Sequence, residues 1–116
     1  IVCLCGSTRF KDAFIKANEV ETLARRIVLT VGCFGHVDTP LTDEQKDVLD
    51  VLHKQKINIA DEVLVINVGG YVGSSTRSEI DHALATGKPV RYLEPVVQAI
   101  EVPPAAPASS PEVDRI

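Results

Sequence analysis

The fold is decided by the stretch VLVINVGGYVGSS, residues 63–75, in which a strongly apolar run ends in a loop rich in Gly and Ser. Residues 63–68 predict a strand that is buried on both faces. After the loop, the spacing of Ile80, Ala83 and Leu84 predicts a helix over 76–86, and Gly87 suits the left-handed residue that ends it. Residues 89–93 form the next predicted strand. This order of elements indicates a parallel βαβ unit.

The same alternation comes before this stretch. Residues 1–5 predict a buried strand, 10–26 an amphipathic helix and 27–31 a second strand, and the capping-box pattern TDEQ at 42–45 begins a second helix. We therefore predict an α/β fold, a three-layer α/β/α sandwich with a parallel, flavodoxin- or Rossmann-like sheet of four to five strands. The residues expected on the buried sides of these two helices are Ala13, Ala17, Val20, Ala24 and Ile27, and Val48, Leu52, Lys56 and Ile59.

Composition limits the classes of function. The 116 residues predict one domain over 1–100, followed by a flexible tail over 101–116 that is rich in Pro, Ala and Ser. A net charge of −4 argues against binding to duplex nucleic acid and favours a small-molecule ligand. The three cysteines, an odd number, predict reduced thiols in the cytoplasm, and no apolar run is long enough to cross a membrane. The chain contains no Met, so we expect the natural protein to begin before Ile1.

No metal or cofactor is expected. No set of Cys, His and carboxylate residues has the sequence spacing of zinc ligands, and the dinucleotide and P-loop motifs are both missing from the sequence.

A first candidate site is the segment GSTRF, residues 6–10, between the first strand and its helix. Gly6, Ser7, Thr8 and Arg9 bring hydroxyl groups, a guanidinium and free backbone N–H groups to a helix N-terminus, which is a combination that binds anions such as a 5′-phosphate. The alternative is a turn glycine followed by a hydroxyl that caps the helix.

A second candidate site is the loop after the strand at 63–68. Its glycines allow a ligand to approach the backbone, and Glu79 is expected in the first turn of the next helix, where the helix dipole would lower its carboxyl pKa. Such a carboxylate can attack an anomeric carbon. The alternative is that Thr76 and Glu79 form a capping box. Tyr71 could stack on a base or only cover the loop.

Four further positions are weaker candidates. Asp61 could line the site, although an Asp before a strand is more often an exposed boundary residue. His36 and Asp38 follow the second strand and could contact a base, or they are a solvated pair. Lys56 could reach the cleft from the second helix, whereas His82 should face solvent.

The order of several short blocks resembles that of a known family. The blocks CGSTR (5–9), AD (60–61), GYVG (70–73) and GKPV (87–90), together with Ser75, Glu79 and Ile80, are similar to the nucleoside 2-deoxyribosyltransferase-like superfamily. This superfamily includes the deoxynucleoside 5′-monophosphate N-glycosidases, and the resemblance covers residues 1–93.

The resemblance implies specific roles. Glu79 would attack the sugar C1′, while Gly6, Ser7 and Arg9 would hold the base or the 5′-phosphate, in a homodimer or higher oligomer. Two features depart from the family pattern: an Asp a few residues before the nucleophile is replaced within residues 73–75, and an aromatic near the start is replaced by Cys3 and Cys5. The hydroxyl-rich loop with Arg9 favours a nucleotide over a nucleoside.

Two other functions remain open. The loop is also similar to that of lysine-decarboxylase-like phosphoribohydrolases, although Glu79 lies later than their motif requires. The third interpretation of the sequence is a non-catalytic nucleotide-binding or sensor module. The candidate residues are Glu79 as nucleophile and Gly6, Ser7, Thr8, Arg9, Asp61, Gly70, Tyr71, Gly73, Ser74 and Ser75 for binding the substrate.

Overall fold

The computed structural model describes residues 1–38 and 40–96 and has an all-parallel sheet of four strands in the order β2-β1-β3-β4. The strands are β1 (Val2–Gly6), β2 (Val28–Leu29), β3 (Glu62–Ile66) and β4 (Val90–Tyr92). β1 and β3 pair along their whole length, from Val2 opposite Glu62 to Gly6 opposite Ile66. The predicted Rossmann-like α/β fold is confirmed.

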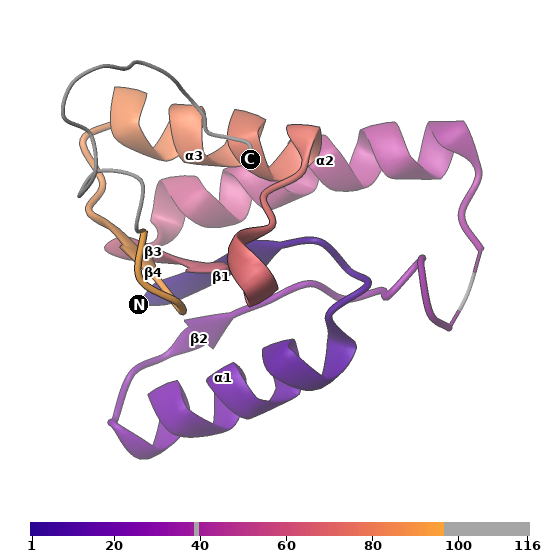
Figure 1. Cartoon of the computed structure of the whole chain (residues 1–116). Coiled ribbons are helices and arrows are strands. Elements are labelled where there is room, and N and C mark those ends of the chain that lie inside the picture. The colour runs from indigo at the N-terminus through magenta and orange to yellow at the C-terminus, as the bar shows by residue number, and fades with distance from the viewer. Residues whose placement is uncertain (39, 97–116) are drawn as a thin grey trace, which may run out of the picture.

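Three helices cover the two faces of the sheet. Helix α1 (Lys11–Leu23) lies on one face, and helices α2 (Asp43–Ile59) and α3 (Ser74–Ala85) lie together on the other (Figure 1). The chain moves from β1 outward to β2 and then crosses back over β1 to reach β3. The direction of winding therefore changes between β1 and β3, which is the place where doubly wound sheets bind ligands at their carboxyl edge.

Strand β1 is the centre of the core. Its residues 2–5 are fully buried, and alternate side chains point to opposite faces of the sheet. Val2 and Leu4 pack on the α1 side, and Cys3 and Cys5 pack on the side of α2 and α3. The rest of the α1-side cluster is Phe14, Ala17, Leu64 and Ile66, and the rest of the opposite cluster is Ile57, Ala60, Val63, Val65, Ile80 and Ala83.

The predicted buried side of the first helix was mostly wrong. Ala17 is buried as expected, but Val20 is 48% exposed and Ile27 is 65% exposed. Helix α1 instead buries Phe14 and Glu21. Apolar residues occur on more than one side of this helix, so their spacing alone could not determine which side meets the sheet.

The same correction applies to α2. Val48 and Ile59 are each 65% exposed, Leu52 is 42% exposed and Lys56 is half-buried, whereas His53 and Ile57 are buried. The buried side is one residue further along the helix than predicted. It includes the polar His53, which a hydrophobic pattern in the sequence does not assign to the core.

Local signals at the helix ends gave mixed results. Thr42 and Gln45 form the predicted capping box, with hydrogen bonds of 2.9 and 3.1 Å, and Gly87 has the expected positive φ of 78°. Helix α3 begins at Ser74, two residues before the predicted start, after a short 3-10 turn (Val68–Gly70).

In the described part of the chain, no helix is long and apolar enough to span a membrane. The predicted tail and the last residues of the predicted domain, 97–116, lie outside the described residues.

Candidate functional site

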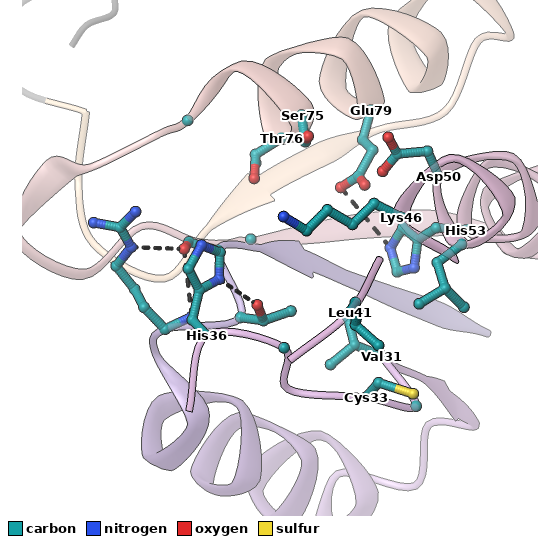
Figure 2. Close-up of a pocket in the computed structure, with 18 of the residues that line it drawn as sticks. Val31, Cys33, His36, Leu41, Lys46, Asp50, His53, Ser75, Thr76 and Glu79 are labelled. Carbon is teal, nitrogen blue, oxygen red and sulfur yellow. Dashed lines mark hydrogen bonds and ion pairs between the residues drawn. The ribbon is translucent and has the colours of Figure 1, made fainter. Parts of the chain in front are cut away.

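A pocket of about 700 Å³ opens at the carboxyl edge of the sheet, beside β1 and β3. Its walls are the loop after β1, the segment after β2, one side of α2 from Asp43 to Lys56, and the start of α3 (Figure 2). This volume is within the range of small-molecule sites. The pocket therefore lies where the parallel topology places ligands.

Most of the predicted site residues line this pocket, but two do not. Asp61 precedes β3 and so lies at the opposite, amino edge, where its side chain is 80% exposed. Gly70 has a positive φ of 82° but is not part of the wall. The predicted residues that line the pocket are Gly6, Ser7, Thr8, Arg9, Tyr71, Gly73, Ser74, Ser75 and Glu79.

The loop after β1 does not cap its helix with a hydroxyl. Helix α1 has Phe10 at its N-cap position and no side-chain cap, so the capping alternative for Ser7 and Thr8 is wrong. Ser7 Oγ instead accepts a hydrogen bond from Arg9 Nε at 3.0 Å. The Arg9 guanidinium lies 4.7 Å from the centre of the Tyr71 ring. Within residues 1–38 and 40–96, Arg9 has no carboxylate partner.

The two polar residues after β2 have different environments. His36 Nδ1 and Thr8 Oγ1 are 2.6 Å apart, which joins the two loops at one side of the pocket (Figure 2). Asp38 pairs instead with Lys11 Nζ at 2.7 Å and is not part of the wall. The segment after β2 therefore contributes an imidazole, and not a carboxylate, to this side.

Glu79 lies in the second turn of α3, deep in the pocket. Because the helix begins at Ser74, Glu79 is its sixth residue, and Thr76 lies inside the helix and not at its N-cap. Both the first-turn prediction and the capping-box alternative are therefore wrong. The Glu79 side chain is 11% exposed, and its Oε1 lies 4.0 Å from His53 Nε2 (Figure 2).

The environment of Glu79 changes its acidity in the direction opposite to the prediction. Burial disfavours the carboxylate and raises the pKa of Glu79 to about 6, while the positive charge of His53 opposes this effect and the nearby Asp50 adds to it. The expected lowering by the helix dipole was wrong, because desolvation outweighs a dipole that acts mainly on the first turn. At neutral pH the carboxylate is still mostly ionised.

Two thiols and an imidazole meet next to Glu79. His53 Nε2 lies 3.6 Å from Cys3 Sγ and 3.4 Å from Cys5 Sγ, and the three potential ligand atoms all lie within 4.8 Å of one another. The hydrogen bond from Cys5 lowers the pKa of Cys3 to about 5, and the same interaction, together with burial, raises that of Cys5. Burial opposes the charged form of His53, but Cys3 and Glu79 raise its pKa overall.

This cluster could hold a metal ion, although the sequence predicted no metal. In a sequence, zinc sites are recognised by ligands that lie close together along the chain. Here two ligands come from β1 and the third from α2, fifty residues away.

Helix α2 also contributes polar residues to the pocket, of which Lys46 and Asp50 were overlooked in the sequence. Lys46, Asp50 and His53 are spaced four and three residues apart, so they share one side of the helix. In Figure 2 the Lys46 side chain extends into the pocket, and Asp50 lies near Glu79. The signal was present as a polar stripe on a helix that has apolar residues on its other sides.

Comparisons with known proteins add no relative. No family model matches this chain, and neither a curated protein nor a solved structure matches it.

Proposed function

We propose that this protein cleaves or transfers the N-glycosidic bond of a nucleoside or nucleoside 5′-monophosphate, with Glu79 as the nucleophile. The observation that carries the proposal is a buried, largely ionised carboxylate deep in a pocket of about 700 Å³, whose opposite wall has a guanidinium with no carboxylate partner in the described residues. A pocket of this size holds a nucleotide. The similarity of the sequence blocks to the nucleoside 2-deoxyribosyltransferase-like superfamily supports the same reaction.

Two properties of Glu79 support attack on a sugar carbon. Its side chain is 11% exposed, so little water competes with it for the substrate, and the pKa of about 6 leaves it ionised at neutral pH. In the proposed reaction, a carboxylate oxygen forms a bond to C1′ while the C1′–N bond breaks and its electron pair leaves with the base. Water or an acceptor base then attacks C1′ and loses a proton to solvent, while the bond between C1′ and the Glu79 oxygen breaks and the carboxylate is regenerated.

The departing base needs a proton. The acidic residue that the family has before the nucleophile is missing from residues 73–75. Helix α2 instead brings Asp50 close enough to Glu79 to raise the pKa of Glu79. Figure 2 shows the carboxyl group of Asp50 near that of Glu79. We therefore assign Asp50 the part of relaying a proton from solvent to the base.

The opposite wall favours a phosphate on the substrate. Arg9 is held over Tyr71 and by Ser7, which orients a guanidinium without neutralising it. Lys46 adds a second cationic side chain that extends into the pocket (Figure 2). Because guanidinium and ammonium groups bind phosphate oxygens strongly, a 5′-monophosphate is the preferred substrate class.

The proposal is tested by product analysis. The protein is incubated with a panel of nucleosides and nucleoside 5′-monophosphates, and free base is measured by chromatography. Glu79→Gln should reduce base release by at least about a thousandfold. Glu44→Gln is the matched control, because Glu44 is an exposed carboxylate of α2 outside the pocket wall. If Glu79→Gln releases base as fast as the wild type, the nucleophile is another group.

The same panel separates catalysis from binding alone. A non-catalytic nucleotide-binding module would be stabilised against heat by its ligand without releasing base. Stabilisation without turnover for every member of the panel would therefore exclude the enzyme and support the sensor function.

We also propose that the chain forms a homodimer. Helix α2 exposes Val48, Val51 and Ile59, each by more than half, on a surface that a second copy could cover. Light scattering after size exclusion tests this: a monomer mass at micromolar concentration would contradict the dimer.

A further inference from the structure

We propose that Cys3, Cys5 and His53 form a binding site for one Zn²⁺ ion beneath the pocket, with the Glu79 carboxylate as the fourth ligand. Thiolate, imidazole and carboxylate groups are the usual protein ligands of zinc. Two thiolates favour zinc over the hard cations Mg²⁺ and Ca²⁺.

The spacing of the ligand atoms fits a tetrahedral site. Zn–S and Zn–N bonds of about 2.3 and 2.0 Å at tetrahedral angles place sulfur and nitrogen about 3.5 Å apart. His53 Nε2 lies 3.6 Å from one sulfur and 3.4 Å from the other. All three atoms lie within 4.8 Å of one another, so an ion between them requires only small side-chain movements.

The backbone already fixes these ligands. Cys3 and Cys5 are two residues apart on β1, so both side chains point to the α2 face, and both are fully buried. His53 is 6% exposed and approaches them from α2. A strand paired on both sides and a long helix hold the three groups in place, which lowers the cost of ordering them around an ion.

Glu79 supplies both the fourth ligand and the route of entry. Its Oε1 lies 4.0 Å from His53 Nε2, near the carboxylate position of a four-ligand site. Glu79 and His53 line the pocket, whereas Cys3 and Cys5 lie behind them. An ion can therefore reach the thiols through the pocket, and the thiol protons leave to solvent as the ion binds.

The ion and the glycosidic reaction would compete. A carboxylate bound to Zn²⁺ cannot form a bond to C1′, so zinc should inhibit base release. This consequence rests on the proposed function, whereas the metal site itself does not.

The first test uses Co²⁺ as a spectroscopic probe for zinc. Wild-type protein is reduced, freed of metal with a chelator and titrated with Co²⁺. We expect one equivalent to produce sulfur-to-cobalt charge-transfer absorption in the near ultraviolet and the intense visible bands of a tetrahedral ion, and Zn²⁺ to remove both. If a folded wild-type protein shows no thiolate–cobalt bands, the site does not exist.

Variants then identify the ligands. Cys3→Ser, Cys5→Ser and His53→Gln should each weaken zinc affinity by about a hundredfold or more, and Glu79→Gln by about tenfold. Cys33→Ser is the matched control, since Cys33 is an exposed thiol outside the cluster. Loss of the cobalt bands in Cys33→Ser, or their persistence in both Cys3→Ser and Cys5→Ser, would overturn the assignment. Unchanged zinc affinity in Glu79→Gln would remove the fourth ligand and the expected competition.

Inhibition is measured separately, as the ratio of base-release rates with and without Zn²⁺. For wild type at saturating zinc, the rate with Zn²⁺ should be at most about a tenth of the rate without it. For Cys3→Ser the two rates should be nearly equal. Cobalt bands without base release under any condition would reject only the glycosidic function. Base release without cobalt bands would reject only the metal site.

Discussion

Two buried glutamates show how differently one residue type is used in this fold. Glu21 of α1 is 6% exposed, and its carboxylate pairs with Arg91 at 2.7 Å and with Arg26 at 3.3 Å. Glu79 of α3 is 8% exposed, and within the described residues its nearest cationic partner is the His53 imidazole at 4.0 Å. The first carboxylate is neutralised by arginines, whereas burial raises the pKa of the second to about 6.

The two glutamates also lie at opposite edges of the sheet. Glu21 is near the amino edge, where Arg91 also binds Glu62 at the start of β3. Glu79 is at the carboxyl edge, inside the pocket. A carboxylate that is already paired is stable but unreactive, and one that is buried without an arginine retains its capacity to bind an ion or attack a carbon. The difference separates an edge at which arginines neutralise the buried carboxylate from an edge at which the buried carboxylate lines a pocket.

The largest effect on stability should come from Glu21→Gln. The amide loses two charge-assisted interactions, so the free energy of unfolding should fall by about 1–3 kcal/mol. The value stays below that of a fully buried pair because the Arg91 and Arg26 side chains are each about 40% exposed. Urea denaturation measures the change. An unchanged midpoint would show that the arginines contribute nothing to the folded state.

Glu79→Gln should instead raise the free energy of unfolding at neutral pH. The native pKa of about 6 lies above the usual 4.5, so the wild type loses stability as pH rises through this window, and its full penalty is present above about pH 7. The variant lacks this penalty, so relative to wild type it should gain up to about 2 kcal/mol between pH 4 and pH 7.

This experiment is done by urea denaturation with a chelator present, so that metal binding does not contribute. Glu44→Gln, which removes an exposed carboxylate, is the control. The other titratable groups that face Glu79 are Cys3, Cys5, His53 and Asp50, and they are the same in the wild type and in both variants. A stability difference between Glu79→Gln and wild type that stays constant over this pH range would contradict the raised pKa.

Asp61→Asn should have the smallest effect. Asp61 is 80% exposed and lies at the edge away from the pocket. Base release should therefore stay within about twofold of wild type. A large loss of activity would return Asp61 to the site and contradict the separation of the two edges.

Much of the fold could be predicted from particular residues. The apolar runs of β1 and β3 have no polar face, so only a sheet covered on both sides can bury them, and the glycines after them mark the carboxyl edge. The loops at 6–9 and 73–75 could be assigned to one site for the same reason, because parallel strands end at the same edge. The same rule could have excluded Asp61 from the site, because a residue that precedes a parallel strand lies at the amino edge.

The faces of the helices could not be predicted. Helix α2 has apolar residues on several sides, so hydrophobic spacing did not show that His53 turns inward while Val48 turns outward. Lys46 and Asp50 were overlooked for the same reason. Packing against Cys3 and Cys5 of β1 and against α3 selects the buried side, and that depends on residues far away in the chain.

The sequence by itself determined that the chain forms a parallel α/β sheet and that its two loops rich in Gly and Ser lie at one edge, because strand and helix periodicity and turn residues are local properties. Only the tertiary structure decided the state of Glu79 and the meeting of Cys3, Cys5 and His53. Burial and the approach of groups fifty residues apart set the pKa of a carboxylate and the spacing of ligands, and neither quantity is defined until the chain has folded.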